Sequence, residues 1–151
     1  MELRPELQPP LVDEDRLTLL TQRIEAIADL LDRGSAAEVE AAIREFNELT
    51  GSSYEPYDFR YYAASRSARD FALEAARPVG RVPDIAREEL IEIVRRIQDV
   101  DPEVDYYVDL FEANILDPRG SGLIYWPPEE LEDATPEEIV DVALSYRPIE
   151  L

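Results

Sequence analysis

Residues 117–128 have the sequence DPRGSGLIYWPP, and this stretch is the most informative about the fold of the chain. Glycine and proline disfavour the interior of a regular helix, so we expect a very short element held between turns. This element presents the adjacent Tyr125 and Trp126. Large aromatic side chains on a stiff element are good contact anchors, because they bury much area for few lost rotamers. The alternative is that both rings pack into the chain's own core.

The composition indicates a folded and strongly acidic protein. The chain has 151 residues and 45% hydrophobic content, enough for one ordinary domain or two very small ones. Thirty-five Asp and Glu residues oppose fifteen basic residues, all of them arginine, which gives a formal net charge of −20. Such a charge repels nucleic acid and anionic membranes and attracts basic proteins. We therefore expect a basic protein partner and no direct binding to nucleic acid or membrane.

The residue types that are missing argue against catalysis. Without Cys or His the chain has no thiolate nucleophile, imidazole base or zinc-thiolate site. The alternating acids of residues 99–105 resemble the start of a calcium loop, but Val104 stands where that loop needs glycine and Leu110 where it needs glutamate. Carboxylate pairs remain, yet with so many acids they arise by chance. We predict no catalytic residue, no metal and no cofactor.

Hydropathy predicts a cytoplasmic protein. No window approaches the roughly 18 apolar residues of a membrane span, and the first residues lack the cationic and apolar pattern of a signal peptide.

The first half of the chain predicts a helical hairpin followed by shorter elements. Asp13 can cap a helix that ends at Gly34, and a capping box at residues 35–38 starts a second helix that ends at Gly51. A short aromatic element over residues 57–62 and a helix that begins near Ser67 follow. Residues 78–83 then read as a linker, because they combine proline and glycine.

The second half repeats this order of elements. A helix capped by Asp84 precedes one that opens at Asp101, the aromatic stretch follows, and a last helix begins at the capping box of residues 135–138 and runs to Tyr146. We therefore predict an all-α fold of two tandem antiparallel four-helix units, residues 1–80 and 81–151, each with a short third helix. An internal duplication explains the repetition, although small helical bundles also resemble one another by chance.

The second half resembles the colicin and pyocin nuclease immunity proteins, most clearly over residues 85–147. The short third helix of that family carries the signature PxGSDLIYYP, which is similar to PRGSGLIYWP at residues 118–127. Its last helix begins Ser-Pro, continues through Ile-Val and ends near Trp-Arg, matched here within residues 135–147. Gly122 stands where the family has aspartate. Residues 13–78 resemble a degenerate second copy, in which residues 58–62, Asp-Phe-Arg-Tyr-Tyr, replace the family's Asp-Leu-Ile-Tyr-Tyr.

The resemblance implies a bacteriocin immunity protein that binds a basic toxin nuclease beside its active site and inhibits it. In the family the second helix selects the partner and the short third helix supplies the shared binding energy. The residues expected to bind the partner are Val104, Asp105, Val108, Asp109, Glu112, Ser121, Tyr125 and Trp126 in the second half, and Asp58, Tyr61 and Tyr62 in the first. By charge alone, the acidic face of residues 101–112 also fits an ordinary solvated helix face.

Two other functions fit the same composition. An acidic mimic of nucleic acid would occupy a nucleic-acid groove by charge alone and would lose its affinity in salt. A helical scaffold would use its two halves to dimerise, whereas an inhibitor of the family type would act as one chain on one target. The net charge is −13 over residues 81–151 and −7 over residues 1–80, which favours the second half as the main binding surface for a basic partner, whether that target cleaves DNA or RNA.

Overall fold

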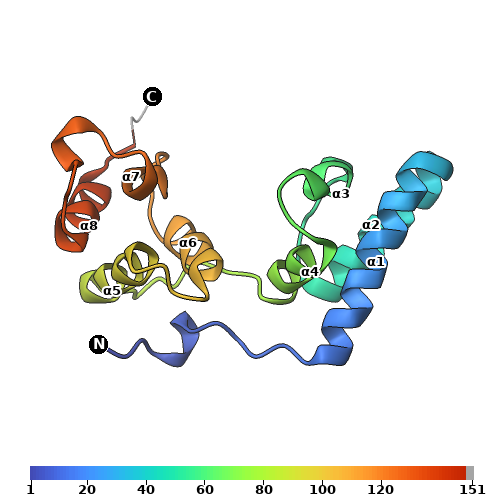
Figure 1. The fold of residues 1–151 in the computed structure, drawn as a ribbon, viewed down its shortest axis with the longest axis horizontal. Coiled ribbons are helices and arrows are strands. Elements are labelled where there is room, and N and C mark those ends of the chain that lie inside the picture. The colour runs from blue at the N-terminus through green and yellow to red at the C-terminus, as the bar shows by residue number, and fades with distance from the viewer. Residues whose placement is uncertain (149–151) are drawn as a thin grey trace. The chain divides into compact units, whose positions relative to one another are not determined.

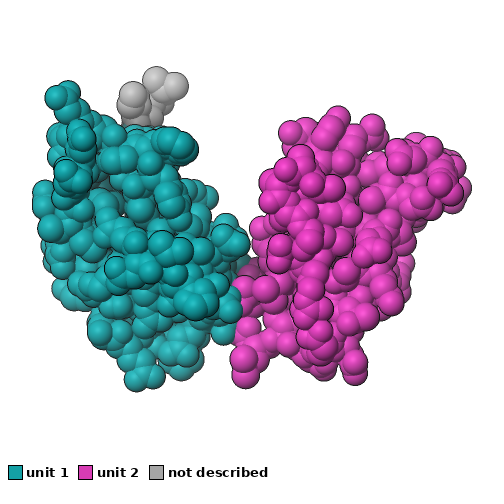
Figure 2. Space-filling model, in the orientation of Figure 1, with its two compact units in different colours: residues 1–9, 79–151 teal, residues 10–78 magenta. Residues whose placement is uncertain are grey.

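The computed structural model describes residues 1–148 and confirms the all-α fold class (Figure 1). Within that range the chain forms eight α-helices and three short 3-10 helices, without a β-strand. Two compact units, coloured separately in Figure 2, divide the chain. Unit 1 consists of residues 1–9 and 79–151, and unit 2 consists of residues 10–78. No helix of the described part is both long enough and apolar enough to span a membrane.

The three longer helices of unit 2 begin at the predicted caps. Its elements are α1 (Glu14–Arg33), α2 (Ala36–Thr50), α3 (Pro56–Tyr61), a 3-10 turn (Tyr62–Ala64) and α4 (Ala68–Ala76). The Asp13 carboxylate accepts a hydrogen bond of 2.8 Å from the backbone N–H of Asp15. Ser35 and Glu38 form the expected capping box, and Gly51 ends α2 in the left-handed conformation with φ of 68°. Local capping chemistry thus fixes the hairpin of α1 and α2.

An aromatic cluster forms the core of unit 2. The Phe59 ring lies edge-on to Phe46 at a centroid distance of 5.3 Å and stacks on Phe71 at 5.1 Å. These phenylalanines come from α3, α2 and α4, and each is at most 1% exposed. Burying one such ring contributes about 1.5–3 kcal/mol. Phe59 therefore attaches the short helix α3 to the longer helices.

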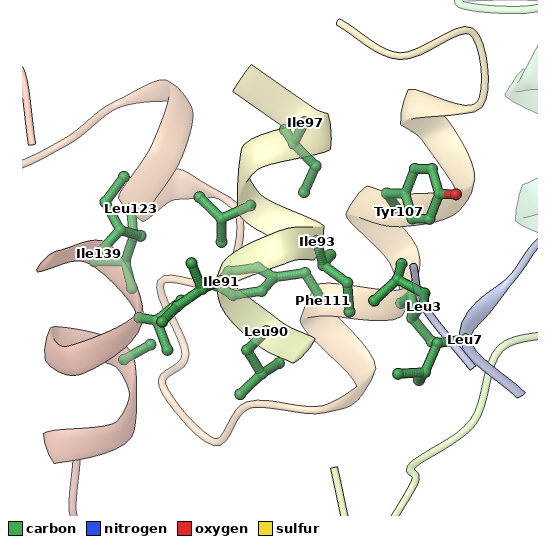
Figure 3. Close-up of a cluster of buried hydrophobic side chains, with 14 of the residues drawn as sticks. Leu3, Leu7, Leu90, Ile91, Ile93, Ile97, Tyr107, Phe111, Leu123 and Ile139 are labelled. Atoms are coloured by element: carbon green, nitrogen blue, oxygen red, sulfur yellow. The ribbon is translucent and has the colours of Figure 1, made fainter. Parts of the chain in front are cut away.

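Unit 1 is built around one central helix. Its elements are a 3-10 turn (Pro5–Leu7), α5 (Arg87–Gln98), α6 (Val104–Ala113), α7 (Gly122–Tyr125), a second 3-10 turn (Glu129–Leu131) and α8 (Pro136–Ser145). Helix α5 packs against both α6 and α8. Because it has neighbours on two sides, its apolar residues are all buried, among them Leu90, Ile93 and Ile97 (Figure 3).

The N-terminal segment belongs to the core of unit 1, which differs from the expected division of the chain at residue 80. Leu3 and Leu7 are at most 1% exposed and join the cluster that contains Ile93 and Tyr107 (Figure 3). The Arg4 guanidinium fastens the segment, because NH1 lies 2.9 Å from Asp84 and Nε lies 3.0 Å from Glu89. Unit 1 is therefore discontinuous in sequence, and residues 10–78 form unit 2 between its two parts.

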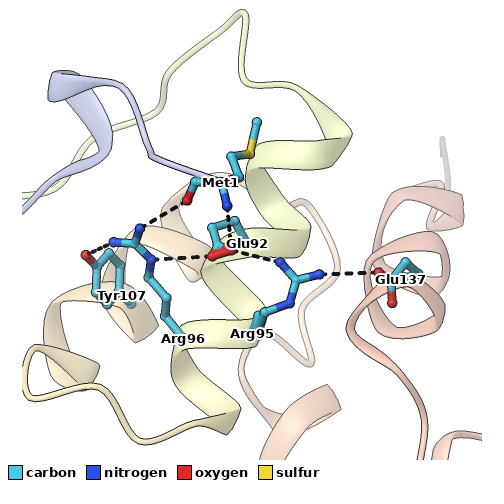
Figure 4. Close-up of polar contacts among 6 residues, drawn as sticks. All are labelled: Met1, Glu92, Arg95, Arg96, Tyr107 and Glu137. Atoms are coloured by element: carbon cyan, nitrogen blue, oxygen red, sulfur yellow. Dashed lines mark hydrogen bonds and ion pairs between the residues drawn. The ribbon is translucent and has the colours of Figure 1, made fainter.

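A buried carboxylate organises one side of α5. Glu92 is 6% exposed and lies 2.8 Å from Arg95 NH1 and 3.6 Å from Arg96 Nε (Figure 4). Arg96 NH1 in turn donates to the Tyr107 hydroxyl at 2.7 Å. Burial alone would lower the pKa of Arg96, but the contacts with Tyr107 and Glu92 outweigh it and raise that pKa. The charge of Glu92 is thus compensated inside the unit, as a buried carboxylate requires.

Two helix starts and one helix end in unit 1 differ from the sequence predictions. Asp84 was expected to cap α5, but it pairs with Arg4, while the Glu89 carboxylate accepts from the backbone N–H of Ala86 at 2.9 Å and performs the capping. Asp101 caps a turn before α6, because its carboxylate accepts from the N–H of Glu103. Tyr146 lies just outside α8 in an extended conformation. Asp84 is engaged by a side chain distant in sequence, and Asp101 by a backbone N–H two residues away. Neither residue therefore caps the helix that it was expected to cap.

Candidate functional site

The stretch of residues 117–126 forms a tight double turn that ends in helix α7. The N–H of Gly120 donates to the Asp117 carbonyl at 3.0 Å, and the N–H of Trp126 donates to the Gly122 carbonyl at 2.8 Å. Gly120 has a φ of 53°, a left-handed conformation that an L side chain rarely adopts. Leu123 is fully buried and is the apolar attachment of α7 to the core. Turn hydrogen bonds and the apolar contacts of Leu123 and Ile124 therefore hold this four-residue helix.

Asp117 forms the first clamp of this turn. The residue is only 4% exposed, and its carboxylate accepts hydrogen bonds of 3.0 and 2.8 Å from Arg119 Nε and NH2. It also accepts from the backbone N–H of Arg119. The Arg119 guanidinium holds the pKa of the Asp117 carboxyl below its usual range. This charge-assisted fork stiffens the chain immediately before the aromatic residues.

Glu112 forms the second clamp and joins α6 to α7. Its Oε1 atom accepts hydrogen bonds from the backbone N–H of Ser121, at 3.2 Å, and from the Ser121 hydroxyl. A Cβ atom added to Gly120 would meet that carboxylate at 3.2 Å, so the turn and the carboxylate fit closely. Sequence reasoning proposed Glu112 and Ser121 as partner contacts, and the structure gives both an additional local role. The pair connects the acidic helix to the aromatic one.

Two large rings project from the end of α7. Tyr125 is 48% exposed and Trp126 is 85% exposed, so Trp126 is the most exposed aromatic residue of the described chain. The alternative in which both rings complete the core does not describe this structure, because Leu123 and Ile124 pack on the core in their place. An indole held in the open on a clamped turn is available to a partner.

One face of α6 carries the acidic residues that the sequence singled out. Asp105 and Glu112 are exposed, whereas Val104, Val108 and Asp109 are half-buried. These positions share a face because they recur at intervals of about one helical turn. The opposite face buries Tyr107, Leu110 and Phe111 in the core of unit 1. The contact of Glu112 with Ser121 joins this face of α6 to the start of α7.

The residues proposed in unit 2 make local contacts different from those of α7. Asp58 accepts from the backbone N–H of Glu55 at 2.8 Å and so caps α3. Tyr62 is half-buried and lies edge-on to Phe71 at 5.6 Å. Tyr61 is exposed, but its ring neighbour is Tyr57, 69% exposed, at a centroid distance of 4.7 Å. Sequence reasoning missed Tyr57, although its spacing of four residues from Tyr61 on a helix would have indicated the pair.

The electrostatics of unit 1 favour a cationic partner. With its N-terminal segment, unit 1 carries twenty-one Asp and Glu residues and seven arginines, a net charge of −14, against −6 for unit 2. Several of those arginines are already paired with carboxylates, as Arg87 is with Asp141 at 2.7 Å. Within residues 1–148, no three carboxylates converge in a way that could hold a metal ion.

The family model that matches this chain covers residues of unit 1. The family model described as "Colicin immunity protein / pyocin immunity protein" matches residues 82–148. The uncharacterized protein YezA of Bacillus subtilis strain 168 is 38% identical over 66 residues, which cover 42% of this chain and 93% of that protein. No solved structure matches the chain. The family match includes the α6 face and the clamped aromatic turn and leaves unit 2 outside it.

Proposed function

The chain belongs to the colicin and pyocin immunity protein family, and from this premise we propose that it binds and inhibits a bacteriocin toxin of the nuclease type. The observation that carries the proposal is the 85% exposure of Trp126 on a turn clamped to the acidic helix α6. An indole held in the open on a stiff turn offers a large contact area for few lost rotamers, and tryptophan is a frequent centre of binding energy in protein interfaces.

In this proposal the negative charge affects the association rate and the aromatic contact affects the dissociation rate. A nuclease that binds anionic nucleic acid presents a basic surface, and the net charge of −14 on unit 1 attracts that surface and speeds association. Trp126 and Tyr125 then supply the contact that slows dissociation. Asp105 and Asp109, beside Val104 and Val108, select one nuclease among several by matching its charges.

Inhibition follows from occupying the substrate surface. An acidic protein bound beside the nuclease active site excludes nucleic acid by bulk and by repulsion of its phosphates. No group of the inhibitor needs to enter the catalytic centre. We propose that this occurs in the cytoplasm of the cell that makes the toxin, one chain on each nuclease.

A contact from unit 2 is a secondary part of the proposal. Asp58, Tyr61 and Tyr62 correspond to the α7 residues in the degenerate copy, but only Tyr61 is well exposed. We propose that any contribution of α3 is made by Tyr61 together with Tyr57. Tyr61→Ala would then weaken nuclease binding less than Trp126→Ala.

The test begins with capture of a nuclease from the producing bacterium on the full chain. The captured protein is purified, and its cleavage of nucleic acid is measured against increasing wild-type protein, Trp126→Ala and the control Leu116→Ala. Leu116 is 60% exposed in the same unit but lines a separate pocket with Tyr146 and Arg147. We expect stoichiometric inhibition by the wild type and the control.

For Trp126→Ala we expect the dissociation constant to rise about 30-fold or more, which corresponds to the roughly 2 kcal/mol or more lost at an interface hot spot. Retention of the complex in high salt separates an aromatic-anchored inhibitor from an acidic mimic of nucleic acid, whose affinity salt abolishes. If Trp126→Ala and Leu116→Ala inhibited equally well, the anchor assignment would be wrong. If the captured nuclease stayed active with excess wild-type protein, the inhibitory function would be wrong.

A further inference from the structure

Unit 2 contains a groove of about 780 Å³ that lies outside the region matched by the family. The end of α1, one side of α2 and one face of α3 form its walls. Its lining residues are Leu31, Gly34, Ala36, Val39, Glu40, Ile43, Arg44, Asn47, Glu48, Ser52, Pro56 and Arg60. This volume falls in the range of about 300–1,000 Å³ that small-ligand sites occupy. Nothing in the proposed contact with a nuclease uses this groove.

Two arginines without partners line the groove. Arg44 comes from α2 and Arg60 from α3, and in the described part of the chain neither guanidinium makes a hydrogen bond or an ion pair. Other arginines of unit 2 are paired, as Arg23 is with Glu45 and Arg69 is with Glu14. Unit 2 has fourteen Asp and Glu residues for eight arginines, so carboxylates are not scarce.

Part of the groove wall is apolar. Leu31, Val39 and Ile43 all line the groove and belong to the apolar side chains of the unit 2 core or pack against it. Pro56 and Arg60 lie one turn apart on α3, so they share the face that meets the groove. Phe59 occupies another face of α3 and enters the core. The groove thus combines an apolar wall with two cationic groups from different helices.

Two glutamates also line this groove and limit what it can accept. Glu40 and Glu48 are exposed and stand four residues before and after Arg44 on α2, and within residues 1–148 neither forms an ion pair with it. They would repel an anion that spread its charge along α2. A ligand with one compact anionic head and an uncharged body avoids most of that repulsion.

From these features we propose that the groove of unit 2 binds an amphipathic carboxylate, a molecule with a single carboxylate head and an apolar body. The head meets the guanidinium groups of Arg44 and Arg60, which match carboxylate geometry. The apolar body lies along Leu31, Val39 and Ile43 and loses contact with water. The chain would then carry a small-molecule site in a groove that none of the residues proposed to contact the toxin lines.

Decanoate is the probe for this proposal, with decyltrimethylammonium as a control of the same chain length and opposite charge. Each is titrated into the full chain below its micelle concentration while amide NMR signals and binding heats are recorded. The variants are Arg44→Gln and Arg60→Gln, singly and together, and Glu40→Gln. Arg33→Gln is the matched control, because Arg33 lies in unit 2 and does not line the groove.

We expect saturable decanoate binding with a dissociation constant of about 0.1–1 mM and shifts concentrated in α2, α3 and the end of α1. Each groove arginine variant should bind about three- to tenfold more weakly, and Glu40→Gln should bind more tightly because repulsion is removed. Arg33→Gln should match the wild type. The proposal would be overturned if decyltrimethylammonium bound as tightly as decanoate, or if the double arginine variant bound decanoate as tightly as the wild type. Amide shifts confined to unit 1 would also overturn it.

Discussion

Replacing Leu7 with alanine should destabilise unit 1 although, apart from Leu3, the other buried residues of its cluster begin only at Leu90. The Leu7 side chain is fully buried in the same cluster as Ile93 and Tyr107. Leu→Ala at a buried site costs about 2–5 kcal/mol, and the lower part of this range applies because a terminal segment relaxes more easily than a helix. We therefore expect a loss of about 2–3 kcal/mol in the free energy of unfolding of unit 1.

Amide hydrogen exchange measures this loss for each unit separately. A change of about 2.8 kcal/mol corresponds to a factor of about 100, so the slowest amides of α5 should exchange about 100 times faster in Leu7→Ala. Amides of α1 belong to unit 2 and provide the internal reference. The matched control is Leu11→Ala, since Leu11 lies four residues further along the chain and is fully exposed.

Leu11→Ala should leave amide hydrogen exchange in both units unchanged. Leu3→Ala should repeat the effect of Leu7→Ala, because Leu3 is equally buried in the same cluster. If α5 exchanged at the wild-type rate in both variants, the N-terminal segment would not belong to the core of unit 1. If α1 accelerated as much as α5, the two units would not unfold independently and the magnitude derived above would not apply.

Three further predictions concern the clamped turn. Glu112→Ala should accelerate amide exchange in α7 and lower stability by about 1 kcal/mol, whereas Glu112→Gln should retain most of the contact with Ser121. Because the pKa of Asp117 is lowered in the folded protein, its contribution to the free energy of unfolding is complete above pH about 4 and is lost as pH falls through the lowered value. Asp117→Asn should therefore flatten the acid limb of a pH–stability curve measured by chemical denaturation. Trp126→Ala should leave the melting temperature within about 1 °C of the wild type, because the indole is 85% exposed; a larger drop in calorimetry would place the ring in the fold rather than in an interface.

Capping chemistry was the most reliable guide to the fold. The boxes at Ser35 and Thr135 and the left-handed Gly51 appear where the residues predicted them, because each involves atoms within a few positions of one another. Asp84 was predicted wrongly, since its partner Arg4 is distant in sequence. Such long-range pairing leaves no local pattern for sequence reasoning to detect.

The N-terminal segment shows the same limit. Leu3 and Leu7 are two leucines in a proline-rich run, too few to produce a helical or strand period, so only the three-dimensional contacts reveal their burial. At the site, the exposure of Trp126 agrees with its predicted availability, whereas the local roles of Glu112 and Asp58 in clamping and capping depend on side-chain geometry. Short polar side chains near turns have many possible partners, and the sequence does not rank them.

The split of unit 1 on either side of unit 2 has a consequence for synthesis on the ribosome. Leu3 and Leu7 are made before unit 2, but α5, which belongs to the same core, begins only at Arg87. At roughly 5–20 residues per second, these leucines wait for several seconds while unit 2 is completed. The order of translation therefore lets residues 10–78 fold first, and it delays closure of unit 1, with its clamped aromatic turn, until α8 has emerged.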